Sequence, residues 1–166
     1  MDFAMTDEQE LLLESVREFC DRYFTEDVIK EMYETGDMPD EIAEAYRDAG
    51  FGLMGIPEEY GGIPCDKVTL GMMIEELYHS SGCNHILYQN SLTAFDIVEF
   101  GTPEQIQKYM DAYMETGWPL CSLSISEPGA GSDNRNMSCT AKKQDDGTYR
   151  LNGQKTWVTM GAKLPY

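Results

Sequence analysis

The 166-residue sequence predicts an α+β protein, with an all-α N-terminal domain at 1–117 and the beginning of a β-rich domain at 118–166. A change of periodicity along the chain leads to this prediction. From Thr6 to about Thr116 apolar residues recur at helical spacings of three or four, whereas from Trp118 onward short strand-like segments are separated by turn residues. With 42% hydrophobic and 11% aromatic residues, the composition is that of a folded chain.

Helix start and stop signals place the first helices. The first begins at Thr6, and Gln9 three residues later can complete a capping box. A second is expected from Thr25 to about Gly36. A third covers 39–49, because proline suits the first turn of a helix and glycine often follows the last.

The next segment, 51–62, interrupts the helical periodicity. Its sequence, FGLMGIPEEYGG, is rich in glycine and holds a proline, so we predict an ordered loop rather than a helix. Beyond it, helices are predicted at 67–80, 83–100 and 103–114, the last after a Thr102 cap.

Short strands are predicted after the helical part, at 118–125, 136–144, 148–154 and 155–160. Asp145-Asp146-Gly147 is typical of a hairpin turn between the second and third of them. The last residues, 161–166, carry no turn that would finish a sheet, so the sheet is expected to be incomplete and to leave an open edge.

The charge balance excludes some classes of partner. Thirty acidic side chains against twelve basic ones give a net charge of -18, which repels phosphate backbones and anionic membrane surfaces. No window is apolar enough for a membrane span, and the N-terminus lacks a basic region followed by an apolar run. We therefore predict a cytoplasmic protein with neither nucleic acid nor membrane as a partner.

Neither the cysteines nor the histidines predict a metal site. The five cysteines are scattered and never spaced C-x-x-C, so we interpret them as reduced thiols. His79 and His85 lack the carboxylate pattern that would complete a metal site, and a helix-surface or capping role is predicted for them.

The glycine-rich bend SISEPGAGSD, at 124–133, is a candidate anion site. A P-loop would need a lysine and a hydroxyl residue after its second glycine, and a dinucleotide fingerprint would need glycine where Asn134 stands. Two interpretations remain open. The bend is either a simple hairpin or bulge turn, or a nest whose backbone N–H groups, with the hydroxyls of Ser126 and Ser132, face a phosphate or a heterocycle.

The segment KTWVT, at 155–159, is a second candidate. In a strand, Trp157 and Thr159 would share one face, where a flat heterocycle could stack on the indole and accept a hydrogen bond from the hydroxyl. The alternative is that Trp157 is a core anchor and Thr159 an ordinary strand residue.

Taken together, these segments resemble the acyl-CoA dehydrogenase flavoprotein family. The order and spacing match from one end of the chain to the other, through the segments DEQELL, GIPEEYGG, GTPEQIQKYM, SEPGAGSD and NGQKTWVT. Within the family, the MDF start and the ILYQ at 86–89 look most like the crotonobetainyl-CoA reductase branch. The resemblance implies a helical N-terminal domain, a β-barrel middle domain of which only the start is present, and a C-terminal helical bundle outside this chain.

The resemblance also implies an FAD site and its residues. Backbone groups near Ile125 and the Ser126 hydroxyl would meet the pyrimidine edge of the flavin, and Ser132 would serve the pyrophosphate and lie near the CoA part of the substrate. Trp157 would pack against the isoalloxazine, with Thr159 near N5, and Tyr88 would border the acyl pocket. The full predicted set is Leu123, Ile125, Ser126, Gly131, Ser132, Trp157 and Thr159 for FAD, and Ser132 and Tyr88 for substrate.

The implied function is that of an FAD-dependent acyl-CoA dehydrogenase acting on the Cα–Cβ bond of a short acyl-CoA, with electron-transfer flavoprotein as a partner and a homo-oligomer as its state. The catalytic base is expected outside this chain, so these residues alone are expected to be inactive. Glu127, beside Pro128, is interpreted as structural, and the pairs Glu58-Glu59 and Glu75-Glu76 as solvated faces. The alternatives are a flavin monooxygenase or nitroalkane-oxidase-like relative, and a non-catalytic acidic interaction module.

Overall fold

The chain is described by a computed structural model that covers residues 4–165, apart from the side chain of Asn90. It divides into two compact units, Met1–Pro119 and Leu120–Tyr166, which we call the helical unit and the hairpin unit. The predicted fold class, a helical part followed by the start of a β part, is confirmed.

The helices of the helical unit begin and end close to the predicted positions. They are α1 (Asp7–Tyr23), α2 (Glu26–Thr35), α3 (Asp40–Asp48), α4 (Lys67–Ser81), α5 (Leu87–Phe100) and α6 (Pro103–Thr116). Both halves of the predicted capping box are present at Thr6 and Gln9, and Gly36 ends α2 in the left-handed conformation, with φ of 70°. Local capping signals thus set most helix boundaries.

Helix α5 begins four residues later than predicted, at Leu87 rather than at residue 83. The carbonyl of His85 accepts a hydrogen bond from the Tyr78 hydroxyl at 3.0 Å, and the N–H of Gln89 bonds to the carbonyl of Ile86. Because a tertiary partner takes the His85 carbonyl, this stretch forms a connection instead of a first helical turn.

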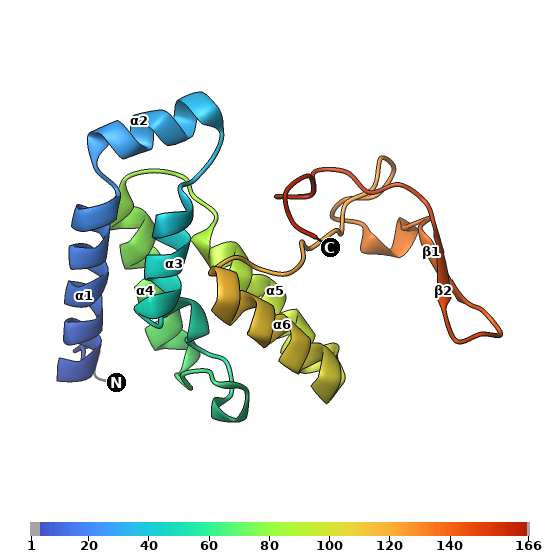
Figure 1. Cartoon of the computed structure of the whole chain (residues 1–166), viewed down its shortest axis with the longest axis horizontal. Helices are drawn as coiled ribbons and strands as arrows, with labels where there is room; N and C mark the ends of the chain where they lie inside the picture. Colours follow the sequence, from blue (N-terminus) through green and yellow to red (C-terminus); the bar gives the residue numbers. More distant parts are fainter. Residues whose placement is uncertain (1–3, 166) are drawn as a thin grey trace. The chain divides into compact units, whose positions relative to one another are not determined.

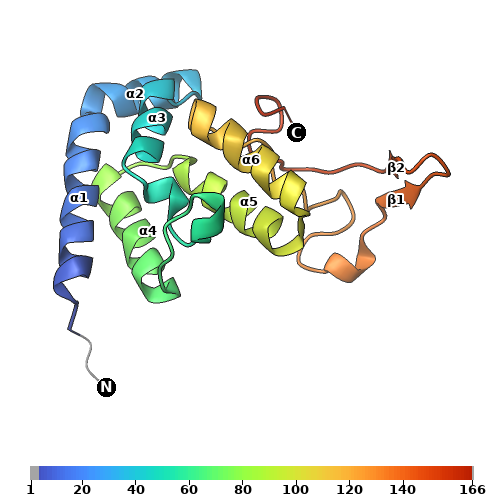
Figure 2. The same ribbon diagram turned by 60° about the horizontal axis from the view of Figure 1, so that its bottom comes forward.

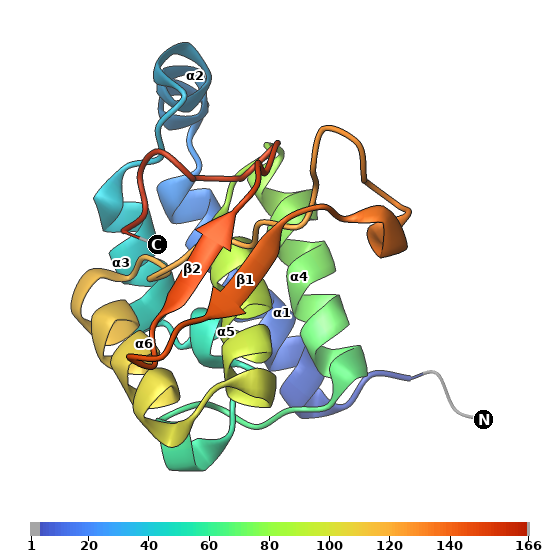
Figure 3. The same ribbon diagram turned by 90° about the vertical axis from the view of Figure 1, so that its right-hand side faces the viewer.

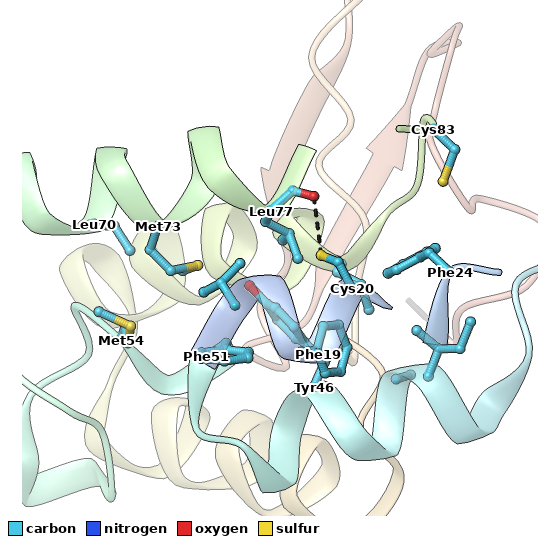
Figure 4. Close-up of a cluster of buried hydrophobic side chains, with 14 of the residues drawn as sticks. Phe19, Cys20, Phe24, Tyr46, Phe51, Met54, Leu70, Met73, Leu77 and Cys83 are labelled. Carbon is cyan, nitrogen blue, oxygen red and sulfur yellow. Dashed lines mark hydrogen bonds between the residues drawn. The ribbon is translucent and has the colours of Figure 1, made fainter. Parts of the chain in front are cut away.

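The helices enclose one apolar core. Helix α1 packs along α4, α5 packs along α6, and α2 crosses between the ends of α1 and α3 (Figures 1 and 2). Figure 4 shows the aromatic centre of this core, where Phe19 lies against the rings of Tyr46 and Phe51, and Cys20 donates a hydrogen bond to the carbonyl of Leu77. Each fully buried large apolar side chain contributes about 1.5–3 kcal/mol, so burial drives the folding of this unit.

The predicted loop at 51–62 is ordered, as expected. It contains two short 3-10 turns, η1 (Phe51–Leu53) and η2 (Glu58–Tyr60). The N–H of Gly55 bonds to the carbonyl of Ile63 at 2.8 Å, and the N–H of Ile63 bonds to the carbonyl of Leu53 at 2.9 Å. These bonds satisfy the backbone of a segment that also carries buried core residues.

The hairpin unit contains an antiparallel pair of strands, β1 (Thr140–Lys143) and β2 (Tyr149–Asn152), with Thr140 opposite Asn152 (Figure 3). The predicted turn joins them: Gly147 has φ of 85°, and the Asp146 carboxylate accepts hydrogen bonds from both the N–H and the hydroxyl of Thr148. The predicted turn is confirmed, but the strands are shorter than the predicted 136–144 and 148–154, since residue 136 belongs to a 3-10 turn (Asn134–Asn136).

The strands predicted at 118–125 and 155–160 are not formed within the described residues. Positive φ angles at Trp157 (59°) and Met160 (61°) turn the second of these segments out of extended geometry. A strand also requires a ladder of backbone bonds, and between the two segments the described residues form one, from the N–H of Thr156 to the carbonyl of Ser126.

No helix of the described residues is both long enough and apolar enough to cross a membrane.

The capping box of α6 gives a test of the local signals. The Thr102 hydroxyl accepts a hydrogen bond from the N–H of Gln105, and the Gln105 side chain accepts one from the N–H of Thr102. We expect Thr102→Ala to lower the free energy of unfolding by about 1 kcal/mol, measured by urea denaturation followed by far-UV circular dichroism. Thr102→Ser keeps the accepting oxygen and should restore most of the loss; equal losses in the two variants would contradict this account.

Candidate functional site

The glycine-rich bend combines the two interpretations left open by the sequence. Glu127 and Ala130 exchange backbone hydrogen bonds of 2.8 and 3.2 Å, so the bend is a closed tight turn. Beyond this closure, the backbone N–H groups of Gly129, Gly131 and Ser132 have no hydrogen-bond partner among the described residues. A side chain at Gly129 or Gly131 would meet nothing within 4 Å, so this face of the turn is open. The bend can therefore present N–H donors to an anion.

Two distant segments lie side by side in the hairpin unit, at 122–126 and 155–159. The N–H of Thr156 donates to the carbonyl of Ser126 at 2.8 Å, and the Ser122 hydroxyl donates to the carbonyl of Thr159. These two contacts give an antiparallel arrangement. Ser126 is consequently next to the segment that carries Trp157 and Thr159, as a shared site requires.

Trp157 is the most exposed large apolar side chain of the described residues, with 91% of its surface accessible. This excludes a core-anchor role within the described part of the chain. The prediction that Trp157 and Thr159 share a strand face is wrong, because Trp157 lies in the left-handed region and the segment is not a strand. The uncovered indole can cover a flat apolar ligand, and the neighbouring segment adds a second exposed apolar side chain, Ile125, which is 42% exposed.

The remaining predicted residues are distributed as follows. Leu123 is half-buried in the first segment, and Gly131 and Ser132, which directly follow the turn, are exposed. Tyr88 is half-buried on α5, in the helical unit.

The carboxylate of Glu127 is held below the bend by donors from other segments. Its side chain is 1% exposed, and it accepts hydrogen bonds from the N–H and hydroxyl of Ser138, from the N–H of Cys139, and from the Lys155 ammonium at 2.9 Å. These donors, with Lys155 contributing most, hold the pKa of Glu127 well below its ordinary value. A carboxylate so fully engaged is structural, in agreement with its interpretation from the sequence.

Sequence reasoning missed the partners of Glu127. The prediction for the segment 155–159 gave Lys155 no role, and the prediction for 136–144 treated Ser138 and Cys139 as ordinary strand residues. No spacing in the sequence connects Lys155 with Glu127, because the two are 28 residues apart and meet through the fold. The sequence offers one weak signal, a lysine two residues before Trp157 in a strongly acidic chain.

One acidic pair departs from prediction. The side chain of Glu76 is 12% exposed and forms a 2.7 Å ion pair with Arg17, so its interpretation as a solvated face is wrong. The hydrogen bond from Arg17, with a second from Ser80, lowers the pKa of Glu76. Glu75, Glu58 and Glu59 are exposed, as predicted.

The role predicted for His85 is also wrong. His85 is 5% exposed and stacked between the rings of Phe24 and Tyr78, with ring centroids 4.9 and 4.4 Å away. Burial lowers its pKa to about 4. The flanking residues Cys83 and Leu87 are apolar and buried. This did not reveal from the sequence that the imidazole between them would also be buried.

Comparison with known proteins decides the family. The chain matches the acyl-CoA dehydrogenase N-terminal domain over residues 6–116 and the acyl-CoA dehydrogenase middle domain over residues 122–166. The chain belongs to the acyl-CoA dehydrogenase family. It is 39% identical, over all 166 residues, to the probable acyl-CoA dehydrogenase YdiO of Escherichia coli K12, of which it spans 43%.

Solved structures agree with this membership. Butyryl-CoA dehydrogenase from Megasphaera elsdenii superimposes with a TM-score of 0.78 and 29% identity, over 98% of this chain and 43% of that one. The FAD complex of PigA superimposes with a TM-score of 0.79 and 25% identity, over 99% of this chain and 43% of that one. Acyl-CoA dehydrogenases are flavoprotein oxidoreductases that bind FAD and act on acyl-CoA.

The hairpin unit fits such a cofactor on its own geometry. FAD joins a flat ring system to a pyrophosphate, and the unit offers an exposed indole at Trp157 together with N–H groups at Gly131 and Ser132 that bond to no other described residue. The Thr156 hydroxyl is buried with no hydrogen-bond partner among the described residues, and the backbone N–H of the same residue bonds to the carbonyl of Ser126.

Proposed function

We propose that this chain is the N-terminal portion of an FAD-dependent acyl-CoA dehydrogenase that acts on the Cα–Cβ bond of a short acyl-CoA thioester. The observation that carries the proposal is the pairing of the segments 122–126 and 155–159, which brings Ser126 next to the exposed Trp157. The identity to YdiO and the likeness to butyryl-CoA dehydrogenase support the same assignment.

Each predicted residue has a role in binding and orienting FAD. Leu123, the backbone near Ile125 and the Ser126 hydroxyl hold one edge of the ring, and the indole of Trp157 covers it. Thr159, two residues beyond Trp157 in the same segment, offers a hydroxyl to the ring. The N–H groups of Gly131 and Ser132, with the Ser132 hydroxyl, receive the pyrophosphate and the adjoining part of CoA.

When bound, FAD would be the two-electron acceptor for the substrate. The chain's own contribution is to fix the ring, to shield it on the Trp157 side and to place donors at its polar edges. The base that removes the substrate proton lies outside these 166 residues in our proposal. Glu127, the buried carboxylate of the hairpin unit, is unsuited to that role, because its oxygens already accept from Lys155, Ser138 and Cys139.

The proposal extends to substrate and partners. Tyr88 on α5 borders the acyl group, and the ILYQ segment at 86–89 favours the crotonobetainyl-CoA reductase branch. An electron-transfer flavoprotein is the proposed electron acceptor. The whole polypeptide is proposed to work as a cytoplasmic homo-oligomer.

A steady-state assay tests this function. The whole polypeptide, supplied with FAD, should reduce an artificial electron acceptor when given butyryl-CoA, and should do so faster than with palmitoyl-CoA. The 166-residue chain alone should show no turnover. Acceptor reduction with a nitroalkane and with none of the thioesters would favour the nitroalkane-oxidase-like alternative, and failure to bind FAD would favour the non-catalytic one.

The hydroxyl of Ser126 provides a residue-level prediction. We expect Ser126→Ala in the whole polypeptide to weaken FAD binding about 5-fold, because one hydrogen bond contributes about 1 kcal/mol. Titration of flavin fluorescence would measure the dissociation constant. Ser124→Ala, an exposed serine of the same segment, is the matched control and should leave the constant unchanged; equal effects of the two substitutions would remove Ser126 from the site.

A further inference from the structure

We propose that the ion pair between the buried carboxylate of Glu127 and the partly exposed ammonium of Lys155 is a positioning device for the cofactor site, which sets the register of the bend against the segment that carries Trp157. The inference rests on the proposed function, because it concerns how the same FAD site is assembled. It assigns a role to two residues that contact the site's backbone rather than the cofactor.

The first observation is the placement of the Lys155 ammonium between two segments. Its nitrogen donates to the Ile125 carbonyl at 2.9 Å and to Glu127 Oε1 at 2.9 Å, and it lies 3.4 Å from the sulfur of Met137. The lysine therefore holds residues on both sides of Ser126. Trp157 is two residues further along the chain from the same lysine.

The second observation is that the Glu127 carboxylate joins a third segment. Its Oε2 accepts from the N–H of Ser138 at 2.6 Å and from the Ser138 hydroxyl at 2.8 Å, and its Oε1 accepts from the N–H of Cys139 at 3.0 Å. Residues 138–139 lead directly into β1. The carboxylate thus connects the bend, Lys155 and the residues that lead into β1 by hydrogen bonds.

The third observation is the scarcity of backbone pairing at the same place. Within the described residues, the segments 122–126 and 155–159 share one backbone hydrogen bond, from Thr156 to Ser126. A single bond fixes the register of two extended segments weakly. The ion pair supplies the additional constraints that a strand ladder would otherwise give.

The energetics favour a role in selecting one arrangement of the segments over a role in stabilising the fold. Burying a carboxylate carries a large desolvation cost, and a buried ion pair roughly offsets that cost instead of adding net stability. Such pairs are useful where they select one arrangement among several. The donors around Glu127 also lower its pKa, so the carboxylate that accepts these hydrogen bonds stays ionised in the neutral range.

The test compares variants of the whole polypeptide loaded with FAD. Lys155→Met removes the bridge but leaves Glu127 its bonds to Ser138 and Cys139, so the unit should still fold. We expect FAD to bind about 10- to 100-fold more weakly, the cost typical of misplaced contact groups, with an altered visible circular dichroism of the bound flavin. Lys155→Arg should recover most of the affinity, and Glu127→Gln should resemble Lys155→Met.

Glu76→Gln is the matched control, because it breaks a 2.7 Å ion pair with Arg17 in the helical unit. It should leave FAD affinity and the flavin spectrum unchanged. Wild-type affinity in Lys155→Met would overturn the inference while leaving the proposed function intact, and a wild-type polypeptide unable to bind FAD would overturn the proposed function itself. Loss of the folded far-UV spectrum in Lys155→Met would also overturn the inference, because the pair would then serve folding.

Discussion

Replacing Gly52 with alanine is expected to destabilise the protein by about 3 kcal/mol, the upper end of the cost of overpacking a core. A Cβ atom at this position would lie 1.8 Å from the hydroxyl oxygen of Tyr113, 2.9 Å from its Cζ and 3.1 Å from Cε1 of Tyr46. Both tyrosines are buried, so neither ring can move into solvent. Urea denaturation followed by far-UV circular dichroism would measure the loss.

A second substitution separates this collision from a general effect of alanine. Within the described part of the chain the buried Tyr113 hydroxyl has no hydrogen-bond partner, so Tyr113→Phe should itself stabilise the protein by about 1 kcal/mol. In that background, Gly52→Ala should cost clearly less, because the atom that it overlaps most is gone. Gly71→Ala, at an exposed position of α4 with open space around it, should instead stabilise by about 1 kcal/mol. Equal costs of Gly52→Ala with and without the Tyr113 hydroxyl would contradict the packing described here.

His85 is expected to make stability depend on pH in the mildly acidic range. Burial lowers its folded pKa from 6.5 to about 4, so the unfolded chain takes up a proton first as the pH falls. The contribution of neutral His85 to the free energy of unfolding is complete above about pH 6.5. It declines between pH 6.5 and pH 4, and the total loss is about 3 kcal/mol. Below pH 4 both states carry the proton and this loss stops growing.

The measurement is the free energy of unfolding of wild type and His85→Phe at several pH values between 7 and 4. Phenylalanine can keep the ring stacked between Phe24 and Tyr78 but cannot take up a proton. As the pH falls over this range, the free energy of unfolding of the variant should therefore rise by about 3 kcal/mol relative to that of wild type. His79→Gln, which changes the exposed histidine of α4, should follow wild type. Parallel curves for wild type and His85→Phe would show that the imidazole is not enclosed as described.

The helical part was predictable because its signals are local. Capping residues such as Thr6 and Thr102 act on N–H groups within the same turn, so sequence neighbours suffice to place the helix starts. Helix α5 was the exception, since the Tyr78 hydroxyl captures the His85 carbonyl from another helix. Tertiary contacts of this kind have no counterpart in periodicity.

The hairpin unit shows the opposite balance. The Asp146-Gly147 turn was predictable, because left-handed backbone and side-chain capping are properties of the turn residues themselves. The geometry of Trp157 was not, since its positive φ breaks a segment whose composition favours a strand. The ion pair between the buried carboxylate of Glu127 and Lys155 was equally unpredictable, because the two residues are far apart in the sequence and meet only in the folded chain.

The central claim is that the pairing of 122–126 with 155–159 belongs to an FAD site that serves acyl-CoA oxidation. The most direct test is anaerobic titration of the whole polypeptide, purified with its flavin, with butyryl-CoA and longer thioesters, followed by visible absorption. Our account predicts a yellow protein whose flavin absorption bleaches on addition of a short acyl-CoA. A flavin that stays fully oxidised with every thioester, or a protein that cannot be loaded with FAD at all, would contradict it.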